Sequence, residues 1–191
     1  LTLLGASILW FGWFGFNAGA EAAWANGDGT YGALGPENSL AGTIVINTLG
    51  ATAAAIIGWL IIEKIKDGKP TAVGAASGAV AGLVAITPAC AFLTPGWALL
   101  LGVIAGALCA LAVELKFKLG FDDSLDVVGI HMVGGFIGCW YLGFFATGTG
   151  LFTGGDGMQL LMRVIAPLAV AIYPFVIALV LGFAIEKTIG F

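Results

Sequence analysis

The only histidine of this 191-residue chain, His131, lies inside a long apolar stretch. An ionisable side chain in a hydrophobic span is costly, so it usually faces the protein interior or a polar path. A neutral imidazole donates a hydrogen bond from one nitrogen and accepts one at the other. His131 therefore suits the passage of a small hydrogen-bonding molecule, and Val127 and Gly134 or Gly135 share its face at helical spacing. The alternative is a structural histidine bonded to a backbone carbonyl.

An aromatic cluster near the N-terminus is a second place where chemistry is expected. Trp13, Phe16, Asn17 and Ala20 fall on one helical face, and Glu21 lies about one turn beyond them. Aromatic faces attract cations by about 0.5 to 2 kcal/mol. The pattern therefore indicates a cation-selecting mouth in which Glu21 could concentrate cations. Aromatic side chains facing lipid or the membrane interface are the alternative.

Acidic residues precede the apolar stretch that holds His131. Asp122, Asp123, Ser124 and Asp126 supply N-cap oxygens and negative charge at a positive helix end, so a structural capping role is expected for them. The cysteines Cys90, Cys109 and Cys139 lack zinc-binding spacings, so no metal or cofactor is predicted.

The composition places these residues in a lipid bilayer. The chain is 60% hydrophobic and 9% charged, whereas soluble domains are about one-quarter charged. A soluble core could not hide this much apolar surface. The net charge of -4 excludes a nucleic-acid partner, which needs a basic patch. The sequence predicts an all-α polytopic membrane protein.

Six stretches have the length and hydrophobicity of membrane-spanning helices, within a single transmembrane domain over residues 1–191. The predicted spans are 3–24, 39–62, 71–90, 96–117, 125–147 and 158–186. Gly78 and Gly82 form a small-x-x-x-small pattern that allows close helix packing. Pro167 and Pro174 in the long final span predict a tilt or a kink.

Lysine residues give the predicted orientation. Lysines cluster in the loops around 63–70 and 114–124, while the alternate breaks contain neither Lys nor Arg. Since cytoplasmic loops are enriched in basic residues, both lysine-bearing loops are expected in the cytoplasm, with the chain passing several times through the plasma membrane. The chain begins inside a hydrophobic segment, which suggests a fragment of a longer protein.

Three motifs resemble the ammonium transporter (Amt/Mep/Rh) family. They are FGWFGFNAG in the first span, GAASGAVAGLVAITPAC in the third and DDSLDVVGIHMVGGFIG leading into the fifth. The resemblance covers essentially the whole chain and implies the sixth to eleventh helices of the family fold. These comprise the second inverted repeat and the long final helix.

The resemblance implies transport of ammonium or ammonia, with methylammonium as a related substrate, by homotrimers with one pore per subunit. In the family, ammonium passes an aromatic gate and loses its proton, and ammonia crosses a hydrophobic pore beside two hydrogen-bonded histidines. By motif position, His131 is similar to the second of those histidines and Phe16 to a gate phenylalanine. Trp13 and Val127 are similar to pore-lining residues, and Asn17 is expected to be structural.

Two departures from the family pattern matter. Ala20 stands where many members carry a vestibule serine, so ammonium recruitment is expected to be weaker or to use Glu21. The first repeat, with the first pore histidine, is absent from the chain. The basic tail that interacts with a PII regulator on the cytoplasmic side is also absent.

Two alternatives follow from the same residues. An ammonium sensor of this fold, coupled to a signalling partner, would tolerate Ala20. An intramembrane serine protease would pair Ser77 with His131, but Ala75 replaces a glycine of the nucleophile motif and no oxyanion hole is identified. We therefore expect a transporter and not an enzyme.

Overall fold

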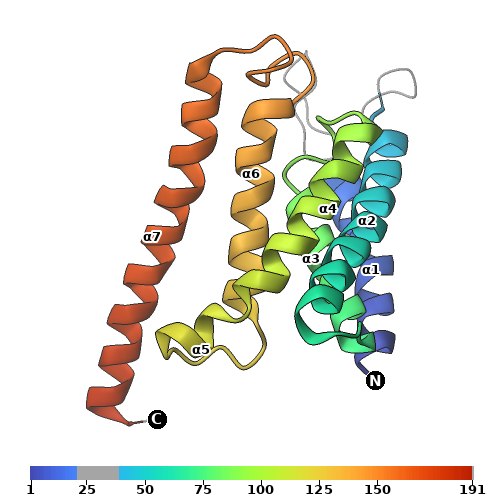
Figure 1. Ribbon diagram of the computed structural model, residues 1–191. Helices are drawn as coiled ribbons and strands as arrows, with labels where there is room; N and C mark the ends of the chain where they lie inside the picture. Colours follow the sequence, from blue (N-terminus) through green and yellow to red (C-terminus); the bar gives the residue numbers. More distant parts are fainter. Residues whose placement is uncertain (21–38, 191) are drawn as a thin grey trace.

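The structure, a computed structural model, describes residues 1–20 and 39–190, and Figure 1 shows that this part of the chain is a bundle of helices. Six long helices occur within the described ranges, together with one short helix and one π-helical segment that continues into α6. They are α1 (Thr2–Gly19), α2 (Ala41–Asp67), α3 (Ala72–Ile86), α4 (Pro95–Ala112), α5 (Leu115–Leu119), η2 (Val127–Met132), α6 (Val133–Phe145) and α7 (Gly157–Thr188).

The predicted all-α architecture of six long helices is confirmed in number and in order. Among the described residues, four helical stretches are long and apolar enough to cross a membrane: Ala41–Asp67, Pro95–Leu119, Val127–Phe145 and Gly157–Thr188. α3 is a shorter apolar helix of 15 residues. α1 has 18 residues and lies against α2 and α3.

The boundaries of three helices differ clearly from the hydropathy prediction. The predicted span 96–117 is divided, because α4 ends at Ala112 and the short helix α5 follows. α2 continues through its polar end to Asp67 and stops where Gly68 takes a left-handed φ of 82°. Polar residues end a hydrophobic stretch but do not by themselves end a helix. A glycine in the left-handed conformation commonly does. α3 ends at Ile86 and not at 90, because the chain enters turns just before Pro88. The prediction of 71–90 was therefore wrong at its C-terminal end.

Helices α2, α3 and α4 pack closely because glycines stand where their backbones meet. A Cβ atom at Gly82 would lie 2.6 Å from the Cβ of Ala55, and one at Gly78 would lie 2.8 Å from the Cβ of Trp59. Gly106 of α4 faces the backbone of Ala55 so closely that a Cβ atom would overlap it. Small residues at helix contacts are the usual means of bringing membrane helices together. These three helices form much of the buried core, to which α6 and the turns after α3 also contribute.

Asn47 fastens the turns between α3 and α4 to this core. Its side-chain amide is fully buried and donates to the carbonyls of Cys90 (2.8 Å) and Leu93 (2.7 Å). Both carbonyls belong to the turns after α3, where they cannot accept hydrogen bonds within a helix. The asparagine supplies those hydrogen bonds instead. The segment that closes one end of α3 is therefore held from α2.

The C-terminal helix α7 lies at the edge of the bundle beside α6 and leans away from it toward the C-terminus (Figure 1). Gly143 of α6 lets it approach, since a Cβ atom there would lie 2.8 Å from the Cδ1 of Leu160. No residue of α7 is buried. Its apolar side chains face outward, as lipid permits, or toward a hollow between α6 and α1.

Candidate functional site

Three hollows follow α1 from one end to the other. We name them after a residue or a position. The Ala20 hollow (about 260 Å³) lies at the C-terminal end of α1, the central hollow (about 420 Å³) at its middle, and the Asp126 hollow (about 340 Å³) at its N-terminal end. The central hollow lies between α1, α3, α6 and α7.

Neighbouring hollows share lining side chains, so the three lie in a row along α1. Phe16 and Thr87 line both the Ala20 hollow and the central hollow. His131 lines both the central hollow and the Asp126 hollow. An aromatic ring therefore borders one pair of neighbouring hollows, and an imidazole borders the other pair.

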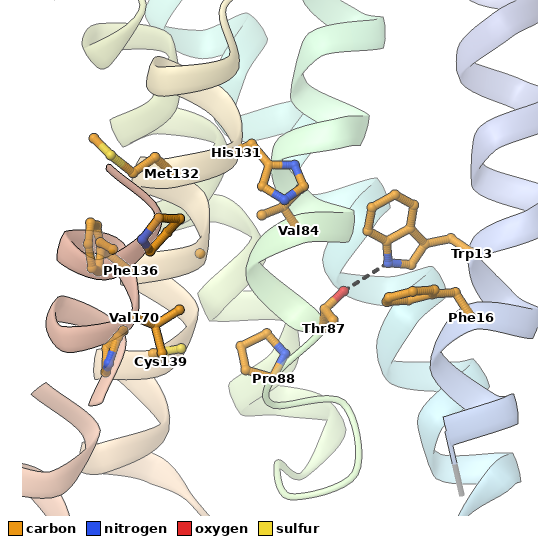
Figure 2. A pocket seen from close by; sticks show the side chains of 14 residues that line it. Trp13, Phe16, Val84, Thr87, Pro88, His131, Met132, Phe136, Cys139 and Val170 are labelled. Carbon is orange, nitrogen blue, oxygen red and sulfur yellow. Dashed lines mark hydrogen bonds between the residues drawn. The ribbon is translucent and has the colours of Figure 1, made fainter. Parts of the chain in front are cut away.

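Trp13 and Phe16 form the aromatic wall of the central hollow. Their ring centroids are 5.4 Å apart at an interplanar angle of 50°. The indole N–H of Trp13 donates to the Thr87 hydroxyl (2.8 Å), which donates to the carbonyl of Leu83 (2.7 Å). Figure 2 shows both rings directed from α1 into the space that His131 also enters. Thr87 thus fixes the orientation of one ring of the pair.

His131 belongs to η2, a π-helical segment that precedes α6. The backbone N–H of Val133 donates to the carbonyl of Val128, five residues back. Within the described residues, the exposed His131 side chain makes no hydrogen bond, and it borders two of the hollows. π-Helical turns occur frequently at functional sites, and this one carries the side chain predicted to act.

Two of the residues predicted to share the face of His131 line hollows together with it. Val127 lines the Asp126 hollow together with His131, and Gly135 lines the central hollow. Gly134 is buried and faces Val84 and the Sγ of Cys109. Of the two glycines predicted at helical spacing, Gly135 alone borders a hollow that His131 also lines.

Asn17 does not continue the face of Trp13 and Phe16 into the central hollow. It is 3% exposed, and its amide donates to the Thr48 hydroxyl of α2 at 3.0 Å. This contact ties α1 to α2. Ala20 lies in the Ala20 hollow beside Phe16, where it offers no polar group. Glu21 lies outside the described residues.

The acidic residues before η2 have different partners. The carboxylate of Asp123 accepts from the backbone N–H groups of Val127 and Val128, both at 2.8 Å, and thus caps the helix. Asp126 occupies the N-cap position but makes no side-chain capping bond, so the capping role predicted for it is wrong. Its carboxylate binds Lys116 at 2.7 Å, while Asp122 accepts from Ser124 at 3.3 Å.

Several residues that line the hollows were not expected there from the sequence. Thr87, Val84 and Phe136, which the sequence did not single out, line the central hollow together with Cys139, and Asp126, expected only as a cap, lines the hollow named after it. The signal for Thr87 was a threonine directly before a proline where a span ends. Among the residues described, no group of three His, Cys, Asp or Glu side chains could hold a metal ion.

Comparison with known proteins identifies the family. The model of the Ammonium Transporter Family matches residues 1–191. The chain belongs to the ammonium transporter family. It is 48% identical to an ammonium transporter of Mycobacterium tuberculosis over 99% of this chain, and 42% identical to one of Bacillus subtilis over 94%. These relatives are named as transporters, not enzymes.

Solved structures of ammonium transporters share the fold. Mep2 of Candida albicans matches 97% of this chain with a TM-score of 0.85 and 28% identity. A protein described as a Sensor Amt Protein matches 97% with a TM-score of 0.82 and 29% identity. The chain spans about two fifths of the length of its relatives: 39% of the mycobacterial transporter and 40% of Mep2.

Proposed function

We propose that this chain forms one wall of a path that conducts ammonium or ammonia across a membrane, with His131 lining its apolar part. The observation that carries the proposal is the row of three hollows, joined at Phe16 and at His131. Family membership supports the substrate, since the relatives are named for ammonium transport.

The order of side chains supports a two-stage passage. Trp13 and Phe16 border the entrance to the central hollow, and their faces favour a cation before it is fully desolvated. Most of the remaining lining is apolar, which penalises a bare ion far more than a neutral molecule. The imidazole of His131 then offers a hydrogen bond to the neutral molecule. Passing first the aromatic rings and then the apolar lining would favour loss of a proton from ammonium before the molecule reaches His131.

The decisive experiment is His131→Ala in the complete protein encoded by the gene, reconstituted in proteoliposomes. We expect the ammonium flux per molecule to fall by about tenfold or more, which corresponds to about 1.4 kcal/mol in the barrier. Val128→Ala is the matched control, because Val128 lies on the same π-helix and lines none of the three hollows. Unchanged flux and ion selectivity in the His131 variant would refute the role proposed for this residue.

A second candidate function is ammonium sensing by the same fold. The match to the Sensor Amt Protein favours it, as does Ala20, which adds no hydroxyl to the Ala20 hollow. A sensor would bind ammonium and conduct little. Current across a solid-supported membrane on adding ammonium would identify a conductor, whereas binding without current would identify a sensor.

The proposal includes the setting of the complete protein. We place it as a homotrimer in the plasma membrane, with the lysine-bearing loops at 63–70 and 114–124 in the cytoplasm, where a PII-type regulator would bind. Cysteines introduced at Lys69 and Lys118 should react with membrane-impermeant reagents only from the cytoplasmic side. Reaction from the outside would show that the predicted orientation is wrong. The mass of the purified complex tests whether the protein is a trimer.

A further inference from the structure

Lys116 binds two groups at the start of the π-helix that carries His131. Its ammonium donates to the backbone carbonyl of Asp123 at 2.8 Å and to the Oδ1 of Asp126 at 2.7 Å. The side chain of Lys116 is 16% exposed, and that of Asp126 is 35% exposed. A lysine of α5, the short helix after α4, is therefore fixed against two of the residues that lead into η2.

The backbone at this point has an unusual conformation. Asp126 has a φ of 56°, the only positive value at a non-glycine residue in the described part of the chain. Such a conformation usually persists only where surrounding contacts impose it. Here Lys116 binds the Asp126 side chain, and the carbonyl of Asp126 accepts from the N–H of Ile130 at 2.8 Å.

The position of His131 depends on this backbone. Its side chain makes no hydrogen bond within the described residues, so in this part of the chain the η2 backbone decides where the imidazole enters the hollows. Gly129 packs against Val113, where a Cβ atom would lie 2.7 Å from the Cα of Val113. The carbonyl of Ile130 accepts from the Sγ of Cys109 at 3.7 Å. These contacts hold the middle of η2 against α4, and Lys116 holds its beginning.

Comparison with the neighbouring lysines distinguishes Lys116 from a surface charge. Lys66 pairs with Glu114, but those side chains are 31% and 39% exposed. Lys118, also on α5, is exposed and has no side-chain partner among the described residues. Exposed pairs contribute little, whereas a partly buried lysine with two acceptors restricts the groups that it binds.

We propose that Lys116 is a positioning residue for His131. By fixing Asp126 and the carbonyl of Asp123, it sets the start of the π-helix and hence the place of the imidazole between the central and Asp126 hollows. The role in transport rests on the proposed function, whereas the effect on the imidazole does not. Small displacements of a positioned group are costly, so loss of Lys116 should be measurable at His131.

The first test measures the imidazole directly in the complete protein. Diethyl pyrocarbonate modifies neutral imidazoles, and mass spectrometry of the His131 peptide gives the rate at this residue alone. We expect Lys116→Met to change that rate by about threefold or more, because the π-helix loses its tie at Asp126. Lys116→Arg should restore it to within about 1.5-fold, since a guanidinium can reach the same acceptors. Lys118→Met is the matched control and should leave it unchanged.

Two results would overturn the positioning role. The first is a Lys116→Met variant in which His131 is modified at the same rate as in the parent protein. The second is a Lys118→Met variant in which that rate changes as much as in Lys116→Met, which would indicate a general effect of the loop. If Lys116→Met yields no folded protein, Asp126→Asn breaks the same ion pair while keeping the side-chain shape. It should then change the rate by about the same factor.

The second test measures ammonium flux. We expect Lys116→Met to lower the maximal rate by about fivefold, with KM changed less than about twofold, because recruitment occurs at the other end of the path. A parental maximal rate per molecule would overturn the role of Lys116 in passage. If the parent protein itself moves no ammonium, the proposed function fails, and the His131 modification rates still decide whether Lys116 positions the imidazole.

Discussion

The two sides of this bundle differ in how closely their helices pack. On one side, which we call the packed side, α2, α3 and α4 meet through glycines, with backbone against backbone. On the other, which we call the open side, α1, α6 and α7 present aromatic and aliphatic side chains to hollows that they do not fill. Both sides are apolar, so hydropathy does not distinguish them.

The difference lies in residue size at the helix contacts. Small residues let three helices on the packed side approach until van der Waals contacts hold them, which is the main attraction available between helices in lipid. On the open side, larger residues such as Trp13, Phe16 and Phe136 border a space. Stability should therefore depend on the first side and passage on the second, and substitutions can test this separation.

The largest effect is expected from Gly106→Ala on the packed side. Its Cβ atom would overlap the backbone of Ala55, so α2 and α4 must separate, at a cost of about 3 kcal/mol or more. Gly135→Ala is the control on the open side, because nothing lies within 4 Å of the added Cβ atom. Thermal unfolding of the complete protein in detergent measures both. If both variants lost the same stability, close packing on the packed side would not be what stabilises the protein.

Asn47→Ala should have the next largest effect. It leaves the buried carbonyls of Cys90 and Leu93 without donors, at a cost of about 2 kcal/mol in the free energy of unfolding. The exposed Val45 on the same helix provides the control, and Val45→Ala should cost well under about 1 kcal/mol. If Asn47→Ala retains parental stability, the turns after α3 do not depend on the packed side.

Thr87→Val tests the boundary between the two sides. The substitution keeps the shape but removes the acceptor for the Trp13 indole, at a cost of about 1 kcal/mol. Because Trp13 then loses its fixed orientation, we expect ammonium flux to fall more clearly than stability. Thr87→Ser keeps the hydroxyl and should behave like the parent. A loss of stability without any change in flux would assign Thr87 to the packed side alone.

The smallest effect is expected at Glu114, which pairs with Lys66 outside both sides. These side chains are 39% and 31% exposed, so solvent screens the pair, and Glu114→Gln should cost no more than about 0.5 kcal/mol. Asp67→Asn on the neighbouring helix serves as the comparison. Should Glu114→Gln destabilise the protein as much as Asn47→Ala, the connection after α4 contributes to the packed side.

The sequence predicted the number and order of the helices because a bilayer demands about 20 apolar residues per span. It predicted their ends less well. Apolar length does not report that Lys64 and Lys66 continue α2, or that turns begin immediately after Ile86. Those ends depend on backbone features such as the left-handed Gly68 and the hydrogen bonds from Asn47.

At the site, the sequence indicated the residues but not all of their directions. Helical spacing placed Asn17 with Trp13 and Phe16, yet a hydrogen bond to Thr48 draws the amide toward α2. Of the acids before η2, Asp123 makes the capping bonds and Asp126 pairs with a lysine ten residues earlier. Partners this distant in the chain have no signature in local spacing, and the roles of Trp13, Phe16, Val127 and His131 in transport stay predictions.

The π-helix has a consequence for the register of α6. An α-helix turns about 100° per residue, so the additional residue within η2 rotates everything before it relative to everything after it by about that angle. The π-type bond runs from the N–H of Val133 to the carbonyl of Val128, so Val127 precedes this offset, whereas Gly134 and Gly138, which pack against α3, follow it. Deleting one residue between Val127 and His131 would therefore keep the spacing of His131 to these glycines while turning Val127 away from the Asp126 hollow. The chain can thus change which side chains precede its histidine along the hollows without repacking α6.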